Sequence, residues 1–160
     1  MPAEIPPPSR PVTSLTVMTC QDNAVLLEVL RAAALGSRRL MPPGLYDAAD
    51  IKAAMAGGLA FLVAYAGPIQ AQSKPVGAVA YRWDHGALRI IHVAVLESTR
   101  GTGVARRMVQ AVENVAQALG APRVAASAAR RVGEREFLAR LGYEAFEPGQ
   151  RTSMVKALSP

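Results

Sequence analysis

The sequence predicts an α/β fold in which one mixed β-sheet carries helices on both of its faces. Short apolar runs, typical of buried strands, alternate with segments whose apolar residues recur every three or four positions, as in amphipathic helices. Three successive strands favour antiparallel pairing, whereas a later strand, helix and strand predict one parallel pair. The 160-residue chain is 51% hydrophobic but only 5% aromatic, so its core must consist mainly of Ala, Val and Leu.

The N-terminal part predicts a tail, a strand and the start of a helix. Residues 1–11 contain five prolines, which is typical of an extended or disordered tail, and residues 12–160 are expected to form a single domain. Residues 14–18 alternate apolar and polar side chains, as in a short strand. Asp22 or Asn23 can cap the helix that follows.

The positions of glycine and proline mark the remaining elements. Two prolines and a glycine make residues 38–46 irregular, and Asp84, His85 and Gly86 are typical of a short hairpin connection. Gly120 and Gly142 end the two later helices. The predicted helices span about 23–35, 48–56, 104–119 and 133–141, and the predicted strands span about 59–66, 76–83, 87–95, 124–128, 143–146 and 153–158.

A glycine-rich turn, residues 100–105, joins the strand at 87–95 to the helix at 104–119. The first N–H groups of a helix lack intrahelical partners, and the helix dipole is positive there. Gly101 and Gly103 remove the Cβ atoms that would keep a phosphate away from the backbone. The turn therefore predicts a site for a phosphorylated small molecule, although an ordinary strand-to-helix turn would have the same sequence pattern.

The element order and three motifs resemble the GCN5-related N-acetyltransferases, or GNAT enzymes. Arg100, Gly103 and Ala105 match the family's coenzyme A motif Gln/Arg-x-x-Gly-x-Gly/Ala, and residues 93–95 look like the strand ending before it. Residues 137–143 are similar to the last helix of the family and the Gly-aromatic pair after it. The resemblance covers residues 12–158. It implies a central, mostly antiparallel sheet with one parallel, splayed strand pair and helices on both faces.

The resemblance also implies a function and a set of binding residues. GNAT enzymes transfer acetyl from acetyl-CoA to a primary amine by direct attack, and the expected acceptor is an amine of a small molecule, peptide or protein. No covalent enzyme intermediate is needed, so positioning and proton handling carry the catalysis. By this resemblance coenzyme A is held by Val93, Ala94, Val95, Arg100, Gly101, Thr102, Gly103, Val104, Ala105 and Arg131.

Three positions depart from the family pattern of acid–base residues. Many members have a tyrosine that protonates the leaving thiolate, and Leu138 stands at that position. Some members have an asparagine where this chain has Arg131, and some have a carboxylate base where it has Arg89. The resemblance therefore predicts coenzyme binding more directly than it predicts an acid or a base.

Glu97, His92 and Tyr143 are the remaining candidates for proton transfer. Glu97 follows the strand and could act as a base through water, but a residue at such a place is more often a solvated turn carboxylate or a helix-approach cap. His92 shares strand parity with Ile90 and Ala94, so a hydrogen-bonded core histidine is the competing interpretation unless a bulge changes the parity. Tyr143 could replace the missing acid or could simply be a packed aromatic.

Charge and cysteine content set limits on other functions. The net charge is +6, and residues 81–160 carry +5 of it, which suits a polyanionic ligand. With Cys20 as the only cysteine and two histidines, no internal disulfide is available and no metal site is expected. No apolar run is long enough to span a membrane, and nothing resembles a signal peptide, so a cytoplasmic protein without membrane contact is expected.

Two alternatives to a small-molecule or peptide acetyltransferase remain open. One is a regulatory module that binds coenzyme A but has lost the acid and the base. The other is an acetyltransferase acting on aminoacyl-tRNA, suggested by the basic second half, although nucleic-acid binding is disfavoured because only 3 of the 18 basic residues are lysine. Many members of the family dimerise, so a homodimer is compatible with the resemblance.

Overall fold

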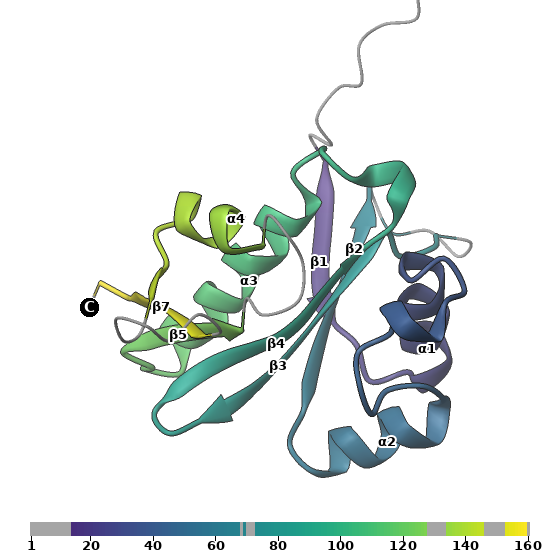
Figure 1. The fold of residues 1–160 in the computed structure, drawn as a ribbon, viewed down its shortest axis with the longest axis horizontal. Coiled ribbons are helices and arrows are strands. Elements are labelled where there is room, and N and C mark those ends of the chain that lie inside the picture. The colour runs from purple at the N-terminus through teal and green to yellow at the C-terminus, as the bar shows by residue number, and fades with distance from the viewer. Residues whose placement is uncertain (1–13, 68, 70–72, 128–133, 146–152, 160) are drawn as a thin grey trace, which may run out of the picture.

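A computed structural model describes residues 14–67, 69, 73–127, 134–145 and 153–159. Seven strands form one sheet in the order β1-β2-β3-β4-β5-β7-β6, and only β4 and β5 are parallel neighbours. The mixed sheet, the parallel pair and the helices on both faces confirm the predicted fold class (Figure 1). The tail predicted for residues 1–11 lies outside the described residues.

The observed elements lie within two residues of their predicted boundaries at each end. Short 3₁₀ turns at Arg38–Leu40 and Glu97–Thr99 add local structure to two connections. The strands are β1 (Leu15–Thr19), β2 (Ala60–Ala66), β3 (Gly77–Asp84), β4 (Ala87–Val95), β5 (Arg123–Ser127), β6 (Glu144–Ala145) and β7 (Ser153–Ala157). The helices are α1 (Asn23–Ala33), α2 (Ala48–Ala56), α3 (Val104–Ala118) and α4 (Glu134–Arg140).

Aspartates cap the two helices of the N-terminal half. Oδ1 of Asp22 accepts hydrogen bonds from the N–H groups of Ala24 and Val25, at 2.9 and 3.2 Å. Oδ1 of Asp47 accepts one from the N–H of Asp50 at 2.8 Å. Each cap satisfies N–H groups that the first helical turn leaves without partners, which fixes where α1 and α2 begin.

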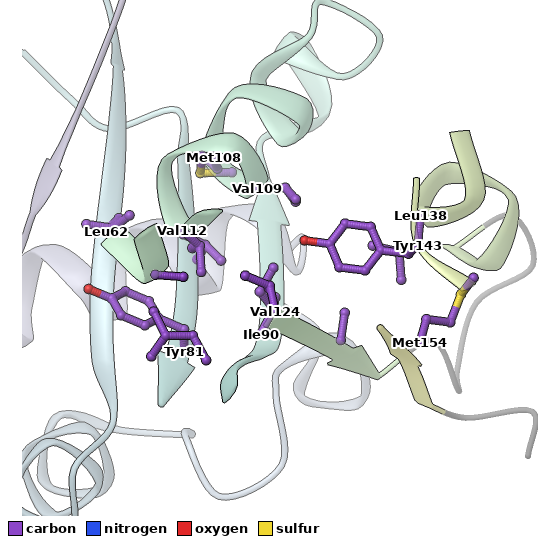
Figure 2. Packing of buried hydrophobic residues seen from close by; sticks show 14 of the residues in the cluster. Leu62, Tyr81, Ile90, Met108, Val109, Val112, Val124, Leu138, Tyr143 and Met154 are labelled. Atoms are coloured by element: carbon purple, nitrogen blue, oxygen red, sulfur yellow. The ribbon is translucent and has the colours of Figure 1, made fainter. Parts of the chain in front are cut away.

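The sheet separates two apolar cores. Helices α1 and α2 pack on one face, where Leu26, Ile51 and Phe61 are almost fully buried. Helices α3 and α4 pack on the other face, where Met108, Val112 and other small or branched side chains meet the sheet (Figure 2). The labelled members of this second core are Leu62, Tyr81, Ile90, Met108, Val109, Val112, Val124, Leu138, Tyr143 and Met154.

Helix α3 approaches the sheet closely at Gly77, the first residue of β3. A Cβ added to Gly77 would lie 2.8 Å from Cε of Met108 and 2.9 Å from the carbonyl oxygen of Ala94. Real Cβ atoms essentially never have contacts this short. Glycine is therefore required here because of packing, and this contact places the first turns of α3 against the C-terminal end of β4.

Candidate functional site

The parallel strands β4 and β5 separate part-way along their length. Their pairing begins at Leu88 and Val124 and ends at Ile90 and Ala126, whereas β4 continues to Val95 with β3 as its partner. Figure 1 shows β5 turning away from β4 beyond this point. The divergence leaves the β5-facing edge of residues 91–95 without a partner strand among the described residues.

The main-chain groups of Val93 and Val95 are directed into this gap. The N–H of Leu96 donates a 2.9 Å hydrogen bond to the carbonyl of Val76, so Leu96 faces the β3 side. Because the main-chain groups of successive strand residues alternate between the two edges, Val95 and Val93 face the β5 side. An extended ligand could add to this edge as a strand does.

The turn before α3 presents a row of unpaired N–H groups. From Gly101 to Arg106, no backbone N–H donates to a backbone carbonyl in the part of the chain that is described. Gly101 and Gly103 have φ of 78° and 89°, and a Cβ on either would meet nothing within 4 Å. The hydroxyl of Thr102 donates to the carbonyl of Thr99, which braces the turn. The open space and free donors fit an anion at a helix N-terminus.

Arg100, the first residue of the turn, contacts helix α1, which packs on the sheet face opposite α3. Its Nη2 donates a 3.3 Å hydrogen bond to the carbonyl oxygen of Ala33, the last residue of α1. A cation there also complements the negative end of the helix dipole. The turn that begins α3 is therefore tied to the C-terminus of α1.

A β-bulge in β4 changes which face His92 occupies. Tyr81 pairs with Ile90, but Ala80 pairs with His92, so Ile91 is an extra residue in β4. His92 lies opposite Ala80, on the face covered by α1, whereas Ile90 packs in the core under α3. The predicted parity with Ile90 is therefore wrong, because the bulge moves His92 to the face on which Arg89 lies.

The other predicted proton-transfer and binding residues are spread apart. Glu97 is exposed and begins the 3₁₀ turn after β4. Arg131 lies outside the described residues. Among the described residues, no group of three or more His, Cys, Asp or Glu side chains is placed to hold a metal ion.

Tyr143 is sealed inside the core under α3. Its side chain is 2% exposed, and its hydroxyl has no hydrogen-bond partner among the described residues. Figure 2 shows the ring beside Leu138, with the hydroxyl pointing toward Val109 of α3. Burial, and secondarily the charge of Glu113, raises the pKa of Tyr143 far above its usual range. The phenol therefore stays protonated, and its surroundings are those of a packed core side chain.

Arg89 lines a cavity of about 190 Å³ on the face opposite α3. Its Nε donates a 2.8 Å hydrogen bond to Oδ2 of Asp84, and Nη1 lies 3.3 Å from the hydroxyl of Ser153 and 3.5 Å from that of Ser127. The bond from Arg89 is the main reason why the pKa of Asp84 is lowered. The cavity is lined by Asp84, His85, Ala87, Arg89, Arg123, Ala125 and Val155.

The sequence did not single out the partners of Arg89. In the sequence Asp84 is typical of a turn, and Ser127 and Ser153 are strand positions without a chemical signal. The alternation of β5 and β7 places both serines on one face, but their approach to Arg89 depends on strand register over 38 and 64 residues of sequence. The cluster could have been predicted only if the registers of β4, β5 and β7 had been known.

A second cavity, of about 480 Å³, lies between the ends of β1 and β2 and helix α2. Cys20, Asn23 and Lys52 contribute to its lining. Burial raises the pKa of the Cys20 thiol, which makes it less reactive. This cavity is formed by other strands than the β4–β5 gap.

Comparison with known proteins decides the family. A family model described as "Acetyltransferase (GNAT) family" matches residues 37–143, about two thirds of the chain. The chain belongs to the GNAT acetyltransferase family. Members of this family are acyltransferases, which places the chain in that general class. No curated protein matches the chain.

Solved GNAT structures share the fold at low sequence identity. An N-acetyltransferase (PaiA) from Thermoplasma acidophilum, solved with coenzyme A, has a TM-score of 0.69 and 14% identity, covering 91% of this chain and 100% of its own. An aminoglycoside 6′-N-acetyltransferase complexed with coenzyme A has a TM-score of 0.68 and 14% identity, covering 91% and 98%. A GNAT acetyltransferase from Brucella melitensis, in complex with acetyl-CoA, has a TM-score of 0.64 and 18% identity, covering 91% and 89%.

The structure also bears on membrane insertion. Among the described residues, no helix is both long and apolar enough to cross a bilayer.

Proposed function

We propose that this GNAT protein is an acetyl-CoA-dependent N-acetyltransferase that acts on a primary amine of a small molecule, peptide or protein. The observation that carries the proposal is the continuity of two binding features. The N–H groups of residues 101–106, which have no backbone partner among the described residues, follow the free edge of β4 after the short 3₁₀ turn at Glu97–Thr99. A ligand with an anionic head and an extended polar arm fits that combination.

The turn before α3 and the free edge of β4 would bind different parts of acetyl-CoA. The backbone N–H groups of Gly101 to Ala105 would hold the pyrophosphate, since the glycines leave room for it. Val93 and Val95 would exchange main-chain hydrogen bonds with the pantetheine arm. Acetyl-CoA supplies an activated acetyl thioester, and an N–H group of β4 beside its carbonyl would stabilise charge developing on that oxygen.

His92 is the best placed of the three candidates for accepting a proton from the amine. The bulge at Ile91 places it just beyond the point where β4 and β5 part, on the face away from α3. An imidazole titrates near neutral pH, so it can take a proton from an attacking amine. Tyr143 is enclosed in the core, and Glu97 lies two residues beyond the strand end.

Calorimetry with acetyl-CoA and coenzyme A tests the binding proposal directly. Wild-type protein should bind both, and purified folded protein that binds neither would contradict the proposal. Mass spectrometry of a panel of primary amines incubated with acetyl-CoA then tests the reaction. His92→Gln should bind acetyl-CoA as the wild type does but have a lower kcat. The difference in kcat between the two proteins should be smallest at low pH, where a protonated imidazole can no longer accept a proton from the amine.

A regulatory module that binds coenzyme A without transferring acetyl is the second candidate. Leu138 is buried in the core where many members have the acidic tyrosine, and Arg89 replaces a carboxylate. This candidate predicts calorimetric binding of acetyl-CoA with no acetylated product over the whole amine panel. The same two measurements therefore separate both candidates from each other and from a protein that does not bind the coenzyme.

A further inference from the structure

The sheet face opposite α3 carries a polar cluster where the β4–β5 gap begins. Arg89 is in register with Ala125, and Ala125 with Val155, so alternate residues of these three strands lie on the same face. Ser127 and Ser153 are paired at the end of the β5–β7 ladder. Because most of these side chains are small, they leave the 190 Å³ cavity beside the Arg89 guanidinium.

The Arg89 guanidinium is held in place, but only some of its N–H groups have hydrogen-bond acceptors among the described residues. Asp84 fixes its Nε at 2.8 Å, while Nη1 makes only the longer contacts of 3.3 and 3.5 Å to the hydroxyls of Ser153 and Ser127. Nη2 has no hydrogen-bond acceptor among the described residues, and the side chain keeps 24% of its exposure. A fixed guanidinium with available N–H groups matches a carboxylate or phosphate, and both serines could donate to the same anion.

The charges around the cavity also favour an anion. Arg123 lines the cavity beside Arg89, and Arg82 is the cross-strand neighbour of Arg89 on this face. The acidic side chain that lines the cavity, Asp84, already contacts Arg89 and lies 3.4 Å from Nε2 of His85. On this face of the described strands the three arginines Arg82, Arg89 and Arg123 outnumber the two carboxylates, Asp84 and Glu144, which pairs with Val155.

The cluster lies close to the place proposed for the reaction. Arg89 comes immediately before Ile90, the last β4 residue paired with β5, and the bulge puts His92 on the same face. About 10 Å of strand separates the Cα atoms of Arg89 and His92. One small molecule can therefore place an amine near His92 and an anionic group near Arg89.

We propose that Arg89, assisted by Arg123 and by the hydroxyls of Ser127 and Ser153, binds an anionic group of the acetyl acceptor. The acceptor is then an amine that carries a carboxylate or a phosphate several bonds from its nitrogen. Arg89 acts as a specificity-determining residue, at a position where some members of the family carry a carboxylate base. This inference rests on the proposed acetyltransferase function.

A series of matched acceptors tests the proposal. The ω-amino acids from β-alanine to 6-aminohexanoate are compared with n-alkylamines of equal chain length, and aminoalkylphosphonates distinguish a phosphate-type anion from a carboxylate. Wild-type protein should prefer one anionic series by at least tenfold in kcat/KM, with an optimum chain length. Arg89→Gln should raise KM for that series about tenfold or more and leave KM for the alkylamines unchanged. The KM of Arg89→Lys should lie between those of the wild type and Arg89→Gln, because lysine keeps the positive charge but lacks the paired N–H donors of the planar guanidinium.

Arg82→Gln is the matched control, since Arg82 lies on the same face but does not line the cavity. Arg82→Gln removes a charge from this face but no group that lines the cavity, so it should raise KM much less than Arg89→Gln does. Equal use of charged and neutral amines by the wild type, or an equal loss for both series in Arg89→Gln, would overturn the proposal.

Failure of the underlying function has a different outcome. A protein that acetylates no amine would contradict the acetyltransferase proposal. The anion site is then tested separately, by NMR titration with 4-aminobutyrate and 3-aminopropylphosphonate. Chemical-shift changes that are centred on residues of β4, β5 and β7 in the wild type and are absent in Arg89→Gln would support the anion site. No binding to wild-type protein overturns it.

Discussion

Nη2 of Arg100 lies 3.3 Å from the carbonyl oxygen of Ala33, so the turn that begins α3 is hydrogen bonded to the end of α1. Arg100→Ala removes this charge-assisted bond, and we expect a loss of about 1 kcal/mol in the free energy of unfolding by urea. Arg106→Ala is the control because Arg106 is exposed on α3 and its side chain makes no such hydrogen bond to the described residues. Equal losses in both variants would show that the bond to Ala33 contributes nothing to stability.

Gly103→Ala separates the binding role of the turn from its folding role. Gly103 has φ of 89°, and a Cβ there meets no protein atom within 4 Å, so we expect only the left-handed backbone cost of about 1–2 kcal/mol. The methyl group would occupy space proposed for the pyrophosphate, and the affinity for coenzyme A should fall at least tenfold by calorimetry. Gly36→Ala, at φ of 73° with equally open space, should show the same stability loss and unchanged affinity.

Gly77→Ala should destabilise the protein by about 1–3 kcal/mol, because the new Cβ meets the backbone carbonyl of Ala94 as well as the flexible end of Met108. Thermal unfolding measures the loss. Gly57→Ala is the control, since its Cβ would make only ordinary contacts of 3.5 and 3.6 Å at a negative φ. An equally small effect at Gly77 would mean that α3 can move away from the sheet without cost.

Local sequence signals predicted much of this architecture. The helix at residues 48–56 and the strand at residues 87–95 match their predicted bounds, because an aspartate cap and a glycine stop delimit the helix and a glycine turn starts the strand. The parallel pairing of β4 with β5 followed from the crossover through α3. The turn at residues 100–105 was found because its glycines and the helix after it are adjacent in sequence.

Features that depend on long-range packing were not predictable in the same way. The bulge at Ile91 arises from how β4 fits β3, and it alone decides the face on which His92 lies. The contacts of Arg89 with Ser127 and Ser153 require the registers of three strands at once. A one-residue error in any register would have moved those side chains to the opposite face.

Tyr143→Phe should leave kcat/KM for acetyl transfer within about twofold of the wild type, because the hydroxyl is buried under α3 with no hydrogen-bond partner among the described residues. Stability near neutral pH should be unchanged or slightly higher, since a buried unsatisfied hydroxyl is removed. A loss of tenfold or more in kcat/KM would instead identify Tyr143 as the missing acid.

The same variant has a predictable pH dependence. The pKa of Tyr143 is raised in the folded state by burial and then by Glu113, so the native protein keeps a proton that the unfolded chain releases above about pH 10. The stabilisation is therefore fully present below pH 10 and is lost as the pH rises further. Denaturant unfolding between pH 9 and 11 should show a smaller decline for Tyr143→Phe than for the wild type.

Lys156→Met should cost about 3 kcal/mol, because Nζ of Lys156 lies 2.6 Å from Oε1 of Glu113, and the glutamate side chain is only 10% exposed. The variant leaves a nearly buried carboxylate without its cation. Adding Glu113→Gln to Lys156→Met removes that charge and should recover most of the lost stability. A double variant as unstable as Lys156→Met would mean that the packing of the lysine stem, rather than its charge, supports the contact between α3 and β7.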